Sequence, residues 1–360
     1  MSSLHLGDLL DLEALEKAIT DGYVRRQQHP DLPLTILNYT ERCQYERAWT
    51  FVTTTCRGLI VNDEGHIVAR PFAKFFNYSE HPEGAFDLGA RVTVTDKLDG
   101  SLGILYPTPD GYAIATRGSF TSEQAQHATK IWRERYADTA DVDQGITWLF
   151  EIIYPGNRIV CDYGDLDDLV LLGGVHHRNG VPITADVLDF PGPKVTEFGY
   201  ATLAEALAAP PRPGAEGIVI CFAHDATMVK VKQNDYVRLH RLVTGLNARA
   251  VWEALGAGNT IADICEPLPD EFHGWVENVA ADLMNRAVAI LTSARREHAR
   301  IKSTLPDGWT RRDYAAAAAT SPLRAWLFML LDGKDPAPKI WRTLRPTGAE
   351  RPFDHGEDAA

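Results

Sequence analysis

The stretch TDKLDGSLGILY, residues 95–106, holds a lysine in a setting that a surface charge would not need. Lys97 lies between Asp96 and Asp99, a Gly-Ser pair follows, and the segment then continues as a predicted strand. A lysine amine has a reference pKa of about 10.4 and is a nucleophile only when it is neutral. Burial or neighbouring cations favour that neutral form, so the rest of the chain must be searched for such neighbours.

Two further lysines lie on one predicted strand, MVKVKQ, residues 228–233. Side chains alternate along a strand with period two, so Lys230 and Lys232 share a face. Together they could lower the pKa of a third lysine and also bind a phosphate. On this motif alone a solvated strand face with two unrelated lysines is the favoured interpretation, because edge strands commonly carry lysine.

Two glutamates lie at the ends of apolar runs. Glu151 follows ITWLF, and Glu216 precedes GIVICF. A charged side chain at a buried strand end is costly unless it has a partner, and either carboxylate could hold a magnesium ion directly or through its waters. Each of them, taken alone, fits an ordinary edge charge equally well.

Cations surrounded by aromatic residues lie upstream of Lys97, in TCRGLIV and RPFAKFFNYSE. Such mixed segments suit a nucleotide, because rings stack on the base and cations pair with the phosphates; the alternative is a Phe cluster in the core with cations at its edge. The sequence has no phosphate-binding G-x-x-x-x-G-K-[ST] loop and no G-x-G-x-x-G turn. The candidate residues that these two segments offer are Arg57, Arg70, Lys74, Asn77 and Glu80.

The pattern of elements predicts an α+β body followed by helices. A helix is expected over 8–21, short strands in a hairpin and a meander over 50–120, and a helix over 121–136 that begins at a Thr/Ser cap. Further strands are expected at 146–153, 168–175, 216–222 and 227–232, and helices at 274–302, 312–320 and 321–331. We therefore expect an α+β domain over 1–243, a helical domain over 244–345 and a flexible tail over 346–360.

The composition excludes several classes of protein. The net charge of -13 counts against non-specific nucleic-acid binding, although a local basic groove stays open. The five cysteines form no C-x-x-C pair, and His176-His177 has no third ligand at suitable spacing, so structural histidines are favoured over a zinc site. No apolar run reaches about 18 residues, and the first residues lack signal-peptide features, so we expect a cytoplasmic protein.

The motifs occur in an order that resembles the covalent nucleotidyltransferases, which are DNA ligases, RNA ligases and capping enzymes. One K-x-D-G is unremarkable by chance, but here Lys97-Leu98-Asp99-Gly100 is followed by Glu151, then EGIV from Glu216, then Lys230-Val231-Lys232. With CRGLIV, RPFAKFFNYSE, TRGSF and FEIIYPGNRIV, residues 40–240 closely resemble the RNA ligase 1 family of bacteriophage T4 type. The helical continuation is also similar to the layout of that family.

The resemblance implies a nucleotidyltransferase (ATP-grasp-like ligase) domain of antiparallel sheets with helices, followed by an all-helical domain. It implies an ATP-dependent RNA ligase that seals 5′-phosphate and 3′-hydroxyl ends through a lysyl-AMP and an RNA-adenylate. The RNA would be a broken strand, with cleaved tRNA as one candidate, and an end-healing kinase or phosphatase would be a partner.

The resemblance also implies roles for individual residues. The catalytic residues would be Lys97, Lys230, Lys232 and Glu216. Glu151 and Glu216 would hold the metal ion. Because carboxylates offer only oxygen atoms as ligands, that ion would be Mg²⁺ or Mn²⁺. The residues that contact ATP, which leaves AMP on Lys97, would be Arg57, Lys74, Asp99, Gly100, Ser101, Arg117, Glu151, Lys230 and Lys232.

Two other functions stay open at this point. A DNA ligase or capping enzyme uses the same motifs, but ATP-dependent DNA ligases resemble K-x-D-G-x-R, whereas Ser101-Leu102 follows Gly100 here. Such enzymes also continue into a β-rich domain. A non-catalytic RNA-binding protein on a ligase fold is the second alternative, and the intact Lys97, Glu151 and Glu216 argue against it.

Overall fold

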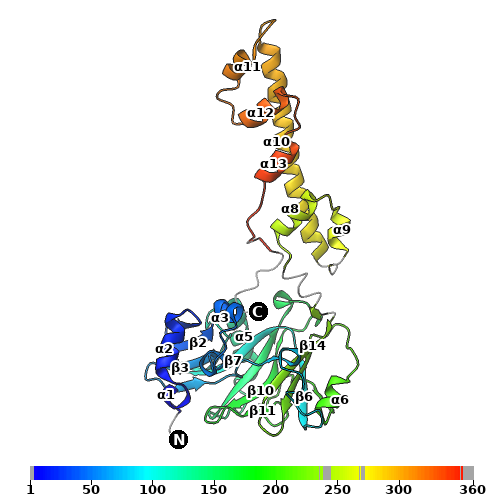
Figure 1. The fold of residues 1–360 in the computed structure, drawn as a ribbon. Helices are drawn as coiled ribbons and strands as arrows, with labels where there is room; N and C mark the ends of the chain where they lie inside the picture. The colour runs from blue at the N-terminus through cyan, green and yellow to red at the C-terminus, as the bar shows by residue number, and fades with distance from the viewer. Residues whose placement is uncertain are drawn as a thin grey trace. The chain divides into compact units, whose positions relative to one another are not determined.

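The computed structural model describes residues 4–234, 236–237, 245–266, 268, 272–348 and 350–351 (Figure 1). The chain divides into two compact units near residue 240. The predicted boundary between 243 and 244, and residues 349 and 352–360 of the predicted tail, lie outside the described residues. Within the described ranges, none of the helices has both the length and the apolar character needed to cross a membrane.

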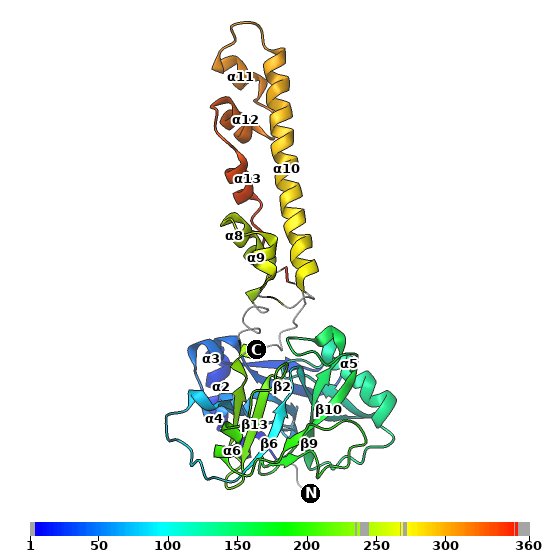
Figure 2. The same ribbon diagram turned by 90° about the vertical axis from the view of Figure 1, so that its right-hand side faces the viewer.

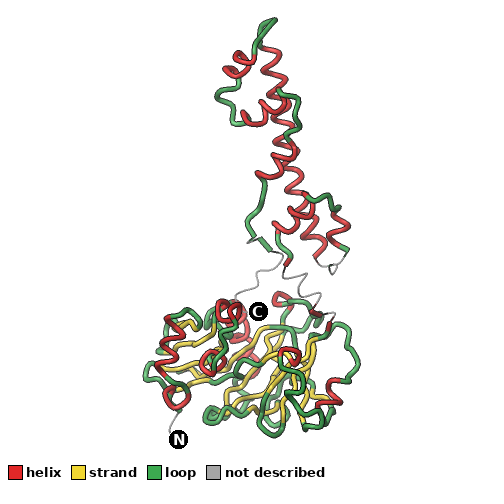
Figure 3. Tube along the Cα trace, viewed as in Figure 1, coloured by secondary structure: helices red, strands yellow, loops and turns green. Residues whose placement is uncertain are grey.

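The described strands all lie in the first unit, where Figure 2 shows them as arrows and Figure 3 in yellow. They form three sheets whose strand pairs are antiparallel, apart from the parallel pair β14–β5. Sheet one has the order β1 (Val24–Gln28), β2 (Leu34–Tyr39), β3 (Arg57–Asn62), β4 (Ile67–Ala69). Sheet two has the order β11 (Pro182–Thr184), β10 (Asp168–His176), β9 (Ile146–Ile153), β7 (Ser101–Thr108), β8 (Gly111–Ala115). Sheet three has the order β12 (Glu197–Phe198), β6 (Val92–Lys97), β13 (Gly217–Phe222), β14 (Met228–Lys232), β5 (Phe76–Asn77).

Short helices surround these sheets. Asp11 accepts hydrogen bonds from the N–H groups of Glu13 and Ala14, so the single helix predicted over 8–21 is observed as two, because a capping residue starts the second. Ser122 caps the next predicted helix, which continues without a break into a π-helical turn. The elements are α1 (Leu6–Leu9), α2 (Leu12–Thr20), α3 (Glu41–Glu46), α4 (Phe51–Thr55), η1 (Tyr78–Glu80), α5 (Glu123–Ile131), η2 (Trp132–Tyr136), η3 (Pro155–Asn157) and α6 (Leu203–Leu207).

The cores explain how the sheets are held. Ile36 and Ile60 of sheet one pack with Ile104 and Leu149 of sheet two in one apolar cluster. The other side of sheet two packs against α5 and η2 through a cluster that includes Trp132. Burying each of these large side chains contributes about 1.5–3 kcal/mol. Sheet three has its own core with α6, so it is a separate layer of the same unit.

One expectation about strand pairing is wrong. The pattern predicted that β6, β7 and β8 form one meander, and β7 does pair with β8. Strand β6, however, pairs with β12 and β13 in sheet three. The reason lies in residues 98–100, which carry the chain from one sheet to the other, so Lys97 ends sheet three and Ser101 begins sheet two.

The second unit is helical in all its described elements, as the sequence predicts. Its long helix α10 covers the span predicted over 274–302, and Phe272, Val276 and Ile340 belong to one of its two cores. Tyr314 and Leu327 belong to the other core, and His298 Nδ1 lies 2.7 Å from the Tyr314 hydroxyl. The helices are α8 (Ala248–Gly256), α9 (Ile261–Cys265), α10 (His273–Thr304), α11 (Arg311–Ala317), α12 (Arg324–Leu331) and α13 (Ala337–Thr343). The α+β class and the helical continuation are both confirmed.

Candidate active site

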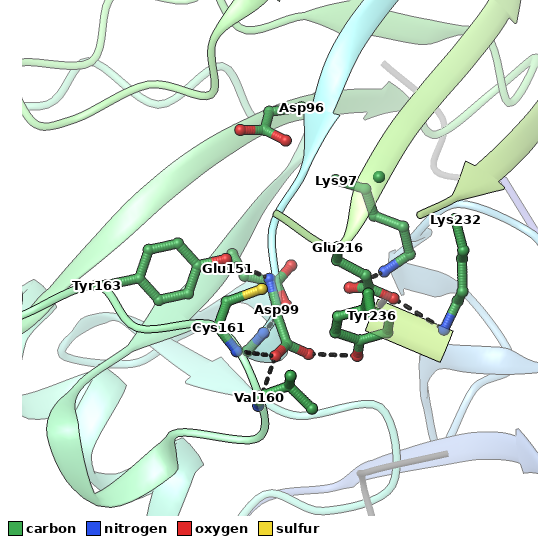
Figure 4. Close-up of polar contacts among 12 residues, drawn as sticks. Asp96, Lys97, Asp99, Glu151, Val160, Cys161, Tyr163, Glu216, Lys232 and Tyr236 are labelled. Atoms are coloured by element: carbon green, nitrogen blue, oxygen red, sulfur yellow. Dashed lines mark hydrogen bonds and ion pairs between the residues drawn. The ribbon is translucent and has the colours of Figure 1, made fainter. Parts of the chain in front are cut away.

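Strand register brings Lys97, Glu216 and Lys232 together. Gly217 lies opposite Lys97 on one side and opposite Lys232 on the other, so the preceding Glu216 is placed between the two lysines. Lys97 Nζ lies 2.6 Å from Glu216 Oε2, and Lys232 Nζ lies 2.8 Å from Glu216 Oε1 (Figure 4). Glu216 is only 3% exposed. A carboxylate so deeply buried is stable as an anion only because both of its oxygens have charged partners.

The ionisation of this group follows from its neighbours. Burial alone would raise the pKa of Glu216, but the ammonium groups of Lys97 and Lys232 outweigh it, and the pKa lies below its ordinary value. Burial lowers the pKa of Lys230 to about 7, and the cations of Lys74 and Lys97 act in the same direction. Lys230 is thus a lysine whose neutral form is favoured first by burial and then by neighbouring cations.

Asp99 holds the backbone of the site. Its Oδ2 accepts hydrogen bonds from the N–H groups of Val160 and Cys161, both at 2.8 Å, and its Oδ1 accepts one from the Tyr236 hydroxyl at 2.6 Å. Its own N–H donates to the Tyr163 hydroxyl at 2.7 Å. Asp99 was predicted to contact ATP, and in this structure its carboxylate is engaged by the protein itself.

Gly100 brings the link between the sheets close to β9. Its N–H donates to Glu151 Oε1 at 2.9 Å, and a Cβ at this position would lie 2.6 Å from the carbonyl oxygen of Ile152. Only glycine allows this approach. Burial raises the pKa of Glu151 to about 8; the charge of Lys97 opposes this effect, and that of Glu216 adds to it.

Three cations from separate segments surround Tyr39, a residue that sequence reasoning missed. Arg117 Nη1 donates to the Tyr39 hydroxyl at 2.7 Å, and Lys74 Nζ lies 5.6 Å from the centre of its ring. Burial alone would raise the pKa of the Tyr39 phenol, but Arg117 and Arg57 outweigh it, and the pKa lies below its ordinary value. The Phe75 ring connects this group to Lys230, because Arg57 Cζ and Lys230 Nζ lie 5.8 and 5.9 Å from its centre.

Arg70 is not brought to this site. Its Nη1 donates to the carbonyl oxygen of His177 at 2.9 Å, and its backbone N–H donates to Thr147 Oγ1. His177 Nε2 lies 2.8 Å from the same hydroxyl, which fits the structural interpretation of the histidine pair. Ser101 does lie at the site, where its hydroxyl donates to Asn157 Oδ1 at 3.2 Å.

Arg212 is a second residue that sequence reasoning missed. Its Nη2 donates to Asp96 Oδ1 at 2.7 Å and to the Gly217 carbonyl oxygen at 2.6 Å, and its guanidinium lies over the Phe198 ring. It therefore ties β6, next to Lys97, to β13, next to Glu216. The available signal was a single cation in the Pro/Gly-rich stretch AAPPRPGAEG, residues 208–217.

The carboxylates suit a magnesium or manganese ion. Burial is the main cause that raises the pKa of Glu151, and repulsion from the negative charges of Glu216 and Asp99 adds to it. A bound cation would reduce that repulsion. In the part of the chain that the structure describes, no group of three or more His, Cys, Asp or Glu side chains is arranged to hold a metal ion. Mg²⁺ is commonly bound by one or two carboxylates completed by phosphates and waters, and the pair Glu151 and Glu216 fits that pattern.

Comparison with known proteins identifies relatives of this chain. A family model described as RNA ligase matches residues 55–236. The chain is similar to a candidate bifunctional polynucleotide kinase/RNA ligase of Autographa californica nuclear polyhedrosis virus, with 25% identity over 66% of this chain and 38% of the relative. It is also similar to a candidate RNA ligase of Thermovibrio ammonificans, with 29% identity over 34% of each chain. The chain thus spans less than two fifths of the length of either relative.

Two solved structures resemble parts of the fold. A Naegleria gruberi RNA ligase with pyrophosphate is 19% identical, covers 42% of this chain and 52% of its own, and has a TM-score of 0.34. A candidate ATP-dependent DNA ligase from Aquifex aeolicus is 12% identical, covers 90% of this chain and 100% of its own, and has a TM-score of 0.46. Both scores are below 0.5, so the assignment of a family rests on the sequence match.

Proposed function

The chain belongs to the RNA ligase family, and from this premise we propose that it is an ATP-dependent RNA ligase that works through a lysyl-AMP on Lys97. The observation that carries the proposal is the contact of Lys97 and Lys232 with Glu216. Three segments far apart in the sequence meet there, in the order that covalent nucleotidyltransferases use. A K-x-D-G sequence that occurred by chance would not be expected to contact the other two motifs in the folded chain.

The first step is attack of the Lys97 amine on the α-phosphorus of ATP. The N–P bond forms, the bond to the β-phosphate oxygen breaks, and pyrophosphate leaves. Glu216, 2.6 Å from Lys97 Nζ, is placed to accept the proton that the ammonium must lose. Lys230 and Lys232 stabilise the charge that gathers on the α-phosphate, which is the main contribution that a protein makes to such a reaction.

The cations around Tyr39 are suited to the β- and γ-phosphates of ATP. Arg57, Lys74 and Arg117 act on Tyr39 from three segments, and burial lowers the pKa of Lys74, so bound phosphates would favour the charged form of these side chains. Binding ATP at these cations would hold its α-phosphorus near Lys97. The role of the cations around Tyr39 is then to position ATP, and they take no part in making or breaking bonds.

Sealing requires two further displacements. An oxygen of the RNA 5′-phosphate attacks the phosphorus of the lysyl-AMP, the N–P bond breaks, and the Lys97 amine regains a proton. The RNA 3′-hydroxyl then loses its proton to solvent and forms a P–O bond with the activated 5′-phosphate, and AMP leaves with the electron pair of the broken P–O bond. Covalent catalysis in this way divides one difficult displacement into easier ones.

Glu151 and Glu216 would hold Mg²⁺ or Mn²⁺ in this proposal. When bound, the ion would supply positive charge at the phosphate oxygens. Glu151 has a second task that needs no ion, because its carboxylate accepts the Gly100 N–H and so fixes the backbone after Lys97.

The proposed biological task is the repair of broken RNA, with cleaved tRNA as one substrate. The ends must carry a 5′-phosphate and a 3′-hydroxyl, so an end-healing kinase or phosphatase would act first. The name of the viral relative joins a polynucleotide kinase with an RNA ligase, which supports such a partnership.

The test is covalent labelling with α-labelled ATP and Mg²⁺, in protein first stripped of bound AMP. We expect a label that resists denaturing electrophoresis and maps to Lys97. The Lys97→Ala variant should lose it, whereas Lys17→Ala, which removes an exposed lysine paired with Asp21, should keep it. A labelled Lys97→Ala protein would refute the assignment of the nucleophile, and an unlabelled wild-type protein, tested with Mn²⁺ and GTP as well, would refute the activity.

A further inference from the structure

A cavity of about 470 Å³ lies away from the Lys97 site. Strand β7 begins at Ser101, beside that site, and its residue Tyr106 lines the cavity. Five residues of strand at about 3.3 Å each place Tyr106 about 17 Å from Ser101. Residues of α5 and η2 form another wall, and the turn between β1 and β2 forms a third. The volume is in the range of about 300–1,000 Å³ that small-molecule sites occupy.

The side chain of Tyr106 faces this cavity. Tyr106 is 2% exposed, and its ring packs against those of His29 and Phe120. Its hydroxyl has no hydrogen bond to any residue that the structure describes, although it lines the cavity. Burial raises the pKa of Tyr106 to about 12, so the hydroxyl is a neutral donor. The hydroxyl is open to the cavity, where a ligand or water can accept its hydrogen bond.

Two free cations stand at the rim. Lys130 and Arg133 are three residues apart in the continuous helical run of α5 and η2, so they share a face. Both are exposed, and neither forms an ion pair within the described ranges of the chain. Asp31 and Glu134 line the same rim, so the cavity offers acceptors as well as positive charge.

This combination fits a ribonucleotide within a strand better than it fits an isolated anion. A ribonucleotide carries a phosphate for Lys130 and Arg133, and it carries hydroxyl and amino donors for Asp31 and Glu134. His29 supplies the aromatic side that RNA-binding sites use for bases. The loop that bears Phe120 also bears Arg117 of the proposed ATP site.

We propose that the cavity beside Tyr106 binds one ribonucleotide of the RNA substrate at a distance from the reacting end, an inference that rests on the proposed function. About 17 Å corresponds to about five nucleotides at a rise of 3.4 Å per nucleotide, and to fewer in an extended strand. The cavity would thus add to the binding of longer RNA strands and would take no part in the reaction. Very short RNAs that end at Lys97 would not reach it.

The experiment measures binding of fluorescent, 5′-phosphorylated single-stranded RNAs of 12 and 2 nucleotides to the full chain. We expect Lys130→Glu combined with Arg133→Glu to weaken binding of the 12-mer about tenfold or more. The slope of the logarithm of affinity against the logarithm of salt concentration should fall by the amount that about two phosphate contacts contribute. Binding of the 2-mer and formation of lysyl-AMP should stay unchanged. Tyr106→Phe, which keeps the packing of the ring, should weaken the 12-mer about threefold.

The matched control is Arg91→Glu combined with Arg178→Glu, which makes the same change of charge at exposed residues of the first unit outside the cavity. Equal loss in control and test variants would show a general charge effect and overturn the site. Wild-type affinity of the Lys130/Arg133 variant for the 12-mer would also overturn it. So would weaker binding of free AMP with unchanged binding of RNA, which would indicate a mononucleotide site.

The two proposals fail separately. If the wild-type protein forms no lysyl-AMP but the cavity variants still weaken binding of the 12-mer, the ligase activity falls and the RNA site stands. If lysyl-AMP forms and the cavity variants bind every RNA normally, the ligase activity stands and the RNA site falls.

Discussion

The lysines around Glu216 and the cations around Tyr39 are adjacent but differ in how their charge is balanced. Glu216 pairs with Lys97 and Lys232 through both oxygens, so that part of the site is neutralised within the protein. Around Tyr39, three cations meet a phenol whose pKa their charge lowers. In the first arrangement a carboxylate lies between two lysines, and in the second the cations gather around an aromatic ring. In the proposed function, the first group performs the chemistry and the second binds the β- and γ-phosphates of ATP.

Replacing Glu216 should have the largest effect on this comparison. Glu216→Gln keeps the size but leaves Lys97 and Lys232 without a counter-charge, so formation of lysyl-AMP should fall by a factor of about 10³ or more. The measurement is the rate of covalent labelling at saturating ATP. Glu205→Gln, at an exposed glutamate of α6, is the control and should label normally. Labelling of Glu216→Gln at the wild-type rate would remove this residue from the chemistry.

Removing a cation at Tyr39 should affect binding more than rate. We expect Lys74→Ala or Arg117→Ala to raise the KM for ATP about tenfold, with a smaller change in kcat, because a charged contact to phosphate is worth about 1.5–3 kcal/mol. Initial rates of labelling across ATP concentrations separate the two constants. A fall in kcat alone would show that these cations act on the transition state. The cations around Tyr39 and the lysines around Glu216 would then not differ in role.

Arg212 offers a finer test, because it contacts no proposed substrate atom. Arg212→Met keeps the packing against Phe198 but loses the hydrogen bonds to Asp96 and Gly217 that tie β6 to β13. We expect labelling to slow about three- to tenfold at unchanged KM for ATP, with partial recovery in Arg212→Lys. An unchanged rate would mean that the register of the two strands alone positions Lys97.

The smallest expected effect is on the pH dependence of stability. Glu151, with a pKa of about 8, binds more protons folded than unfolded between pH 4.5 and 8, so it makes the free energy of unfolding fall as pH rises through that window. Lys230, with a pKa of about 7, binds fewer protons when folded between pH 7 and 10.5, so it makes stability rise there. Each slope is at most about 1.4 kcal/mol per pH unit.

Denaturant unfolding at several pH values checks these signs. Glu151→Gln should remove the fall between pH 4.5 and 8, and Lys230→Met should remove the rise between pH 7 and 10.5. The same slopes in variant and wild-type protein would show that neither residue titrates as described.

The sequence predicts local features of this site better than its long-range contacts. Ordered motifs single out Lys97, Glu216 and Lys232, and the structure brings these side chains together, although their chemical roles stay predictions. Tyr39 and Arg212 carry no motif, because their importance depends on partners from distant segments. The pairing of β6 was mispredicted for a related reason: alternation of apolar residues identifies a strand but not the sheet that it joins.

The link from Lys97 to Ser101 has a mechanical consequence. Glu216 immediately precedes β13 of sheet three, and Glu151 lies on β9 of sheet two, so the two carboxylates are carried by different layers of the unit. Any ligand held by both would act as a crosslink between the layers and would resist their separation. The four residues from Lys97 to Gly100 connect the two sheets, so a ligand bound at the site would restrict the motion of sheet two relative to sheet three.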